Sequence, residues 1–286
     1  MLFLHNILNS VWMIEPAYAA NFLPLVDAYI RGENMIQQPA EKKVFGIEVA
    51  QSVDSVYTLS EYGAEISPEK APKNSLAIVH ITDSITKYDQ DCGPAGMLTK
   101  AKLLQRCYNN PNINAIALVI DSGGGEGYAM RHMVETIGKR NKPVGAFISD
   151  NAFSAAAGIA TAADIVIASS TWARIGSFGT YVTIADYKKR YEQMGIELLQ
   201  LYATDSNDKN QAYIQALKGN TELLQKVVNT FNDQFLSMVE QNRGEKLKAD
   251  RSVWGTGKEW FAEEALELGI IDGIDTFENF INYFNV

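Results

Sequence analysis

Strand-like and helix-like hydrophobic patterns alternate through the middle of the chain. Short apolar runs rich in β-branched residues predict buried strands at 75–81 (SLAIVHI), 113–121 (INAIALVID), 144–149 (VGAFIS) and 163–169 (ADIVIAS). Helical spacing separates these runs in MLTKAKLLQRCYNN and in the segment that follows SGGG. Strands and helices that alternate at such short intervals predict an α/β core with helices on a largely parallel sheet.

The C-terminal part is mostly helical in its pattern. ADYKKRYEQMG is amphipathic, IELLQLYA is strand-like, and apolar residues three and four apart predict a long helix over 221–242. The segment KEWFAEEALELGIIDGI predicts a helix stopped by Gly269, followed by a short strand at Ile270 and Ile271.

The first 74 residues have a more mixed pattern. EPAYAANFLPLVDAYIR has helical spacing and starts with an acid and a proline, which suit a helix start. FGIEVAQSVDSVYTL alternates like a strand or hairpin, and EYGAEISPEKAPKN is linker-like. We therefore expect an N-terminal extension, 1–74, and a core domain, 75–286. The alternating segment could pair with an edge of the core or with another subunit, and its sequence does not decide between them.

Charge and composition narrow the classes of protein. The net charge of −9 argues against a surface built for nucleic acid or anionic lipid. The N-terminal AYAA could mimic a signal-peptidase site, but a basic n-region is missing and Glu15 precedes it, so we expect no signal peptide. With no apolar stretch of roughly 20 residues, we expect a cytoplasmic protein without a membrane anchor. Cys92 and Cys107 are expected to be free thiols.

One serine, Ser154, lies where a strand meets a helix. VGAFIS leads into an expected tight turn at Asp150 and Asn151, and a helix of small residues, AAAGIATAA, follows the serine. Backbone N–H groups at a helix start have no intrahelical acceptor and can bind an oxyanion. Ser154 is therefore either a nucleophile or simply the cap of the helix.

The glycine run at 123–125 follows a predicted strand and exposes backbone N–H groups to which an anion can bind. Tyr128 stands where the GxGxxG fingerprint needs its third small residue, and no GK[ST] follows, so a nucleotide site has little support. An oxyanion hole is the better use of these glycines. We expect no cofactor and no metal.

A nucleophilic serine also needs a base. The histidines (His5, His80 and His132) all precede Ser154, so a triad with a downstream histidine cannot be assembled. A lysine can replace histidine if burial keeps its amine neutral. The lysines at 188 and 189 fall on a charged helix face, whereas Lys209 lies in a loop after the strand-like IELLQLYA and could turn inward.

The order of IDSGGG, FSAAAGIATAADIVIAS and IGSFG resembles the signal peptide peptidase family of serine proteases and their phage relatives. Ser154 precedes Asp164 by ten residues, as the nucleophile does in that family, and FAEEALELGIID is similar to the family's C-terminal motif. The resemblance spans roughly 75–274. It implies a Clp protease/crotonase-like fold of repeated strand-strand-helix units and a Ser-Lys dyad.

The resemblance assigns roles to particular residues. Ser154 would be the nucleophile, Lys209 the general base, and Ser177 would help to hold the lysine. The backbone N–H groups of Gly124 and Ala155 would form the oxyanion hole. Lys218 is the next candidate for the base.

The segment IEPAYAANF resembles the opening of phage capsid-assembly proteases of the lambda minor-capsid type. This likeness implies a head-maturation endopeptidase that cleaves scaffold or capsid proteins, associated with the prohead in the host cytoplasm. Relatives of this fold form rings, so a homo-oligomer is expected. The alternatives are a cellular protease like the signal peptide peptidases, a crotonase-fold acyl-CoA enzyme without a nucleophile, and a non-catalytic structural protein.

Overall fold

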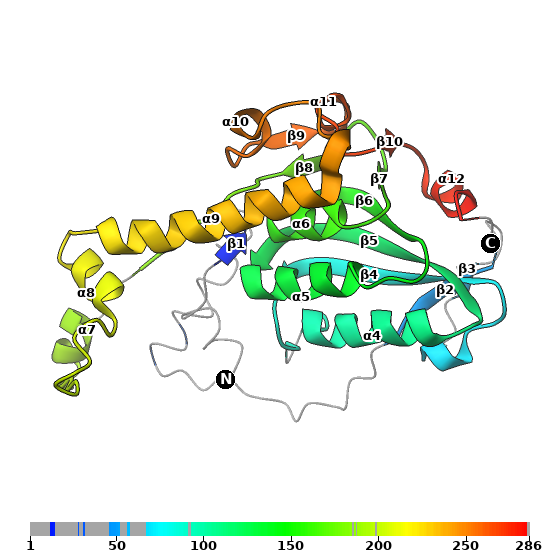
Figure 1. Ribbon diagram of the computed structural model, residues 1–286. Helices are drawn as coiled ribbons and strands as arrows, with labels where there is room; N and C mark the ends of the chain where they lie inside the picture. The colour runs from blue at the N-terminus through cyan, green and yellow to red at the C-terminus, as the bar shows by residue number, and fades with distance from the viewer. Residues whose placement is uncertain are drawn as a thin grey trace.

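A parallel sheet forms the centre of the computed structural model (Figure 1), which describes residues 12–14, 28, 31, 46–51, 56–57, 67–90, 93–184, 186, 188–197 and 199–284. Its inner strands are β4 (Ser75–Ile85), β5 (Ile113–Glu126), β6 (Val144–Phe153) and β7 (Ile165–Ala168). They lie in the order β7-β6-β5-β4, and each neighbouring pair is parallel. The predicted α/β core with a largely parallel sheet is confirmed.

Short strands extend this sheet on both sides. β10 (Gly273–Ile274) pairs with β7, whereas β2 (Glu48–Ala50) pairs antiparallel with β4 and carries β3 (Val56–Tyr57). β8 (Arg174–Gly176) lies parallel to the end of β6 and antiparallel to β9 (Glu259–Phe261). The alternating segment of the N-terminal part thus pairs with the edge of the core through β2.

Helices cover the sheet because they have small or apolar faces to bury. α4 (Met97–Asn109), α5 (Gly127–Ile137) and α6 (Ala155–Thr161) contribute to one large apolar core, against which the C-terminal half of α9 (Glu222–Arg243) also packs. Gly158 permits this close packing, since a Cβ there would lie 2.4 Å from the Met130 sulfur and 2.9 Å from the Phe235 ring. A second apolar cluster joins α12 (Phe277–Asn282) to the sheet.

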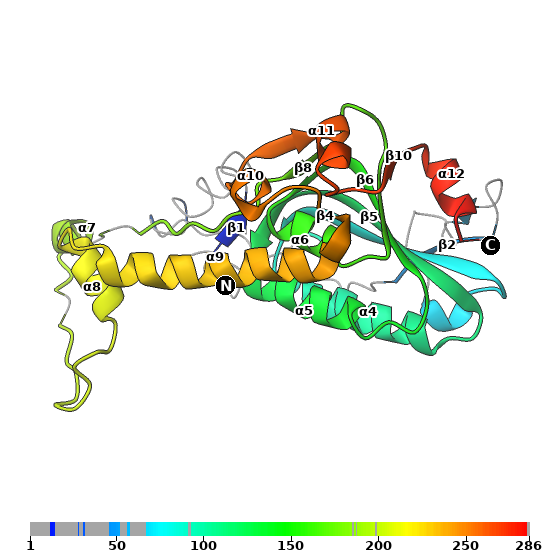
Figure 2. The same ribbon diagram turned by 45° about the horizontal axis from the view of Figure 1, so that its top comes forward.

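The N-terminal half of α9 extends away from the core together with α8 (Gln211–Leu217) and α7 (Lys188–Gln193), as both views show (Figures 1 and 2). We call residues 188–230 the arm. Leu199 and Leu201 on it are 80% and 85% exposed. The long helix predicted over 221–242 is confirmed, but the strand predicted for IELLQLYA is wrong in the described residues 196–197 and 199–203. A strand needs a neighbour for its backbone hydrogen bonds, and this part of the arm lies beside no sheet edge.

Other boundaries differ from the sequence predictions where pairing extends a strand. The expected turn at Asp150 and Asn151 is wrong, because residues 151–153 pair with β8 and keep β6 extended. The glycines at 123–125 end β5 rather than open a helix, since β4 pairs with them. After α11 (Ala262–Glu267) the left-handed Gly269 ends the helix as predicted, but the strand forms at β10 instead of at 270–271.

The remaining elements are short. They are η1 (Pro68–Lys70), η2 (Gly244–Lys246) and α10 (Arg251–Trp254), and β1 (Trp12–Ile14) pairs with the end of β5. The helix predicted for EPAYAANFLPLVDAYIR lies outside the described residues except at Ala28 and Arg31. The division at 74/75 stays a prediction. In the described part of the chain, no helix has the length and apolarity required to cross a bilayer.

Candidate active site

Ser154 occupies the sharp turn between β6 and α6. Its φ of +53° is unusual for a residue with a side chain, and two backbone hydrogen bonds hold it there. The Ser154 N–H donates to the Gly176 carbonyl at 2.8 Å, and the Ser154 carbonyl accepts from the Gly158 N–H at 2.9 Å. The first bond exists because Phe153 and Gly176 are opposite each other in the β6–β8 pair. Strand pairing and helix initiation therefore fix this strained residue from both sides.

Among the residues that the structure describes, the Ser154 hydroxyl has no hydrogen-bond partner. The residue is 1% exposed, and its Oγ forms no capping hydrogen bond with the backbone of α6. Ser154 therefore occupies the N-cap position of α6 without the side-chain hydrogen bond by which a serine caps a helix. A buried hydroxyl without a partner is costly in free energy, and such groups in native proteins often mark a redox or catalytic role.

The predicted oxyanion donors both lie next to this turn. Ala155 is the first residue of α6, so its N–H has no acceptor within the helix. Gly124 follows Ser122 by two residues, and Ser122 is opposite Ala152 in the β5–β6 pair. The Gly124 N–H donates to Ser122 Oγ at 3.1 Å, while Ser122 Oγ donates to the Asp83 carbonyl. One of the two predicted donors therefore already has an acceptor within the protein.

Glycine is required in this segment for steric reasons. Gly124 has a φ of +96°, which favours a residue without a side chain. A Cβ on Gly125 would lie 1.9 Å from the Ile85 carbonyl oxygen on β4. The segment thus presents bare backbone beside the Ser154 turn.

Ser177, the predicted partner of the lysine, also lies close to the turn. It follows Gly176, the residue that accepts the Ser154 N–H. Ser177 has a φ of +52°, and its N–H donates to the Lys258 carbonyl at 2.8 Å. Ser154, Ala155, Gly124 and Ser177 are therefore gathered at one end of the sheet.

Lys209 is not brought to this cluster. It lies two residues before α8 on the arm, its side chain is exposed, and its N–H donates to the Ser206 carbonyl at 3.2 Å. α8 and α6 are at separate places in both views of the fold (Figures 1 and 2). Lys218, at the end of α8, is likewise exposed on the arm. Within one copy of the chain, neither of these two candidate lysines is therefore a partner of Ser154.

The histidines are not partners of Ser154 either. His80 contacts Glu48 at 3.0 Å, and this hydrogen bond lowers the pKa of the Glu48 carboxyl. His132 lies on α5, and the Ser154 hydroxyl has no partner of any kind among the described residues. His5 lies outside the described residues. The exclusion of a histidine base thus agrees with the geometry of His80 and His132.

Sequence reasoning passed over one acid near the site, Glu126. It is 3% exposed, and burial raises the pKa of its carboxyl despite a hydrogen bond from the Lys87 N–H at 3.1 Å. Its Oε1 atom has no partner. The sequence signal that could have identified Glu126 is its position directly after the glycine run. Among the described residues, no cluster of His, Cys, Asp or Glu is arranged to hold a metal ion.

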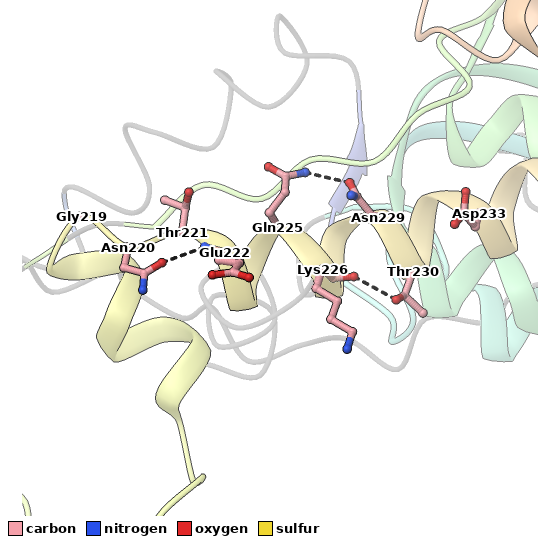
Figure 3. A pocket seen from close by; sticks show the side chains of 9 residues that line it. All are labelled: Gly219, Asn220, Thr221, Glu222, Gln225, Lys226, Asn229, Thr230 and Asp233. Carbon is pink, nitrogen blue, oxygen red and sulfur yellow. Dashed lines mark hydrogen bonds between the residues drawn. The ribbon is translucent and has the colours of Figure 1, made fainter.

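An open groove lies on the arm, where α8 turns into α9 (Figure 3). Two of its polar side chains pair along the helix, in the 2.8 Å bond from Gln225 Nε2 to Asn229 Oδ1. None of the predicted site residues lines it. The lining residues are Gly219, Asn220, Thr221, Glu222, Gln225, Lys226, Asn229, Thr230 and Asp233.

Comparisons with known proteins identify relatives among peptidases. Residues 137–285 match the model of peptidase family S49. Protease 4 of Haemophilus influenzae is 26% identical over 215 residues, which cover 73% of this chain and 34% of that protein. Capsid assembly protease C of Escherichia phage lambda is 24% identical over 277 residues, covering 92% of this chain and 60% of that protein. The chain thus spans less than two thirds of the length of either relative.

Among solved structures, the chain is similar to a mutant of ClpP1 from Listeria monocytogenes, with 14% identity, 71% of this chain and 92% of that chain covered, and a TM-score of 0.46. An enoyl-CoA hydratase/isomerase family member aligns with a TM-score of 0.44, 15% identity, and coverage of 84% of this chain and 74% of that chain. The assignment rests on the sequence matches, which confirm the expected family resemblance. Since the family model covers more than half of the sequence, the chain belongs to peptidase family S49.

Proposed function

We propose that this chain is a serine endopeptidase in which Ser154 is the nucleophile. The observation that carries the proposal is its buried hydroxyl, which has no partner and sits on a strained turn. Strain of this kind costs about 1–3 kcal/mol and tends to be kept at functional sites. The Ala155 N–H, which has no acceptor within α6, supports this role as a donor beside the hydroxyl.

In the proposed reaction, Ser154 Oγ bonds to the peptide carbonyl carbon while its proton passes to a neutral lysine amine. The carbonyl oxygen becomes an oxyanion that accepts from the N–H groups of Ala155 and Gly124. For this, the Gly124 N–H must exchange its Ser122 acceptor for the oxyanion or be shared between the two. The carbon–nitrogen bond then breaks, the lysine returns the proton to the leaving amine, and water hydrolyses the acyl-enzyme.

We propose that the base is Lys209 from a second copy of the chain. A lysine acts as a base only where burial removes its amine from water, and Lys209 is exposed in one copy. Exposed leucines nearby, Leu199 and Leu201, support an association surface on the arm. Docking the arm onto another subunit would bury both leucines and bring Lys209 to Ser154 of that subunit. A closed ring of identical copies would satisfy this requirement at every site.

The proposed biological role is the processing of scaffold or capsid proteins at the prohead in the host cytoplasm. Similarity to capsid assembly protease C over 92% of this chain supports this role, as does the EPAYA segment. Co-expression with neighbouring capsid and scaffold proteins tests it. Processing by wild type and not by Ser154→Ala is expected, and equal processing by both would refute Ser154 as the nucleophile.

A fluorophosphonate probe tests the nucleophile without knowledge of the substrate. Wild type should be labelled and Ser154→Ala should not, while Ser252→Ala, a change at an exposed serine on α10, should be labelled like wild type and serves as the matched serine control. A crotonase-type enzyme without a nucleophile would leave all three unlabelled.

Mixing two inactive variants tests the source of the lysine. Ser154→Ala and Lys209→Ala should each be inactive alone, and a refolded mixture should recover activity because some sites combine an intact serine with an intact lysine from another copy. Activity in Lys209→Ala together with its loss in Lys218→Ala would instead assign the base to Lys218. Loss in Lys209→Ala without recovery on mixing would place serine and lysine in one copy.

A further inference from the structure

An N-terminal strand lies on the glycine segment of the proposed site. β1, three residues long, pairs antiparallel with the end of β5 in the register Trp12–Glu126, Met13–Gly125 and Ile14–Gly124. The paired residues are 110 to 114 positions apart in the sequence, so this contact is tertiary. Figures 1 and 2 show β1 beside the end of β5 and near α6.

The register identifies the edge of β5 that β1 occupies. β4 takes one edge, because Ser84 is opposite Gly124 in the β4–β5 pair. β6 takes the other edge as far as the pair formed by Ser122 and Ala152. β1 must therefore lie on the β6 side, where β6 leaves the sheet two residues after Ala152, at Ser154. Of the three β1 residues, Ile14 is the nearest to that point in the register.

An exposed strand edge binds extended polypeptides through its unpaired N–H and carbonyl groups. At residues 124–126 this edge borders both the proposed nucleophile and the proposed oxyanion donor Gly124. A peptide substrate needs to lie extended there if its carbonyl is to reach Ser154. β1 holds the same backbone groups of β5, so β1 and a substrate exclude each other.

We infer that Trp12–Ile14 is a built-in occupant of the edge that a polypeptide substrate would use, and that it keeps the site blocked until it is displaced. The effect on catalysis rests on the proposed function, whereas the pairing of β1 with β5 does not depend on it. A strand of three residues makes few hydrogen bonds, so β1 stays paired with β5 mainly because both belong to the same chain. A longer substrate strand that pairs with the same edge can therefore replace it.

Proline substitutions in the full-length chain test this inference. N–H groups point alternately to opposite sides of a strand, so only one of Met13→Pro and Ile14→Pro removes an N–H that faces β5. The other variant is the matched control. The disruptive variant should react with the fluorophosphonate about fivefold to tenfold faster than wild type, the effect of one lost backbone hydrogen bond. A synthetic SVWMIEP peptide should slow that variant again, and a scrambled peptide should not.

Amide hydrogen exchange at residues 124–126 reports the pairing without catalysis. Faster exchange in one proline variant, together with faster labelling of Ser154, is the expected result. Faster exchange without labelling of any variant would refute the proposed nucleophile and leave the strand contact in place. Equal exchange and equal labelling in wild type and both variants would overturn the inference, as would slower labelling in both variants.

Discussion

Replacing Ser154 with alanine should stabilise the fold while abolishing activity. The hydroxyl is buried and has no partner, and such a group costs about 1–3 kcal/mol. Removing the oxygen also leaves a small void, so the lower end of this range applies. We expect Ser154→Ala to raise the free energy of unfolding by about 1 kcal/mol, because water no longer has to be stripped from an unpaired hydroxyl.

Urea denaturation followed by tryptophan fluorescence measures this effect as a shift of the midpoint at constant slope. Ser122→Ala is the matched control, since Ser122 is also fully buried but its Oγ accepts from the Gly124 N–H and donates to Asp83. That variant should lose about 1–3 kcal/mol, because a backbone donor and a backbone acceptor are left unpaired. The reasoning is refuted if Ser154→Ala is destabilised as much as Ser122→Ala.

Three further predictions concern the core. Asp272→Asn should lose about 3–5 kcal/mol of stability, because it unpairs Arg243, whose side chain is 1% exposed. Burial opposes ionisation of Asp272, yet the hydrogen bonds and charge of Arg243 lower its pKa below 3.8. The stabilisation that ionised Asp272 provides is therefore complete above pH 3.8 and is lost as the pH falls through the pKa of Asp272 in the folded protein. The urea midpoints of wild type and Asp272→Asn should therefore converge in acid. Burial raises the pKa of the Cys107 thiol to about 12. In a Cys92→Ser variant, Ellman's reagent at pH 8 should therefore react with Cys107 only as the protein unfolds. Rapid reaction of the native protein would contradict this prediction. Gly125→Ala should lower the free energy of unfolding by about 3 kcal/mol or more, since its Cβ would lie 1.9 Å from a carbonyl oxygen of β4. Thermal or urea unfolding measures this loss, and a midpoint equal to that of wild type would disprove the contact.

Elements whose signal is local could be predicted from the amino-acid sequence. Apolar runs located the four inner strands, the spacing of apolar residues located α9, and Gly269 marked a helix end. It also singled out Ser154, because a strand, a serine and a helix of small residues are contiguous in the chain. The absence of a downstream histidine was likewise a matter of chain order alone. These features depend on periodicity and on neighbours within a few residues, which a sequence displays directly.

Features that depend on partners distant in the chain became visible in the folded molecule. β8 pairs with Asn151 to Phe153 and keeps the end of β6 extended, so the turn falls on Ser154. The sequence around the expected turn could not reveal this pairing. IELLQLYA has strand composition but no sheet edge beside it, and Lys209 consequently stays on an exposed arm rather than beside a buried strand. The contact of Trp12–Ile14 with β5 crosses more than a hundred residues. A strand can pair with any free strand edge in the fold, and a local sequence pattern does not indicate which edge is free.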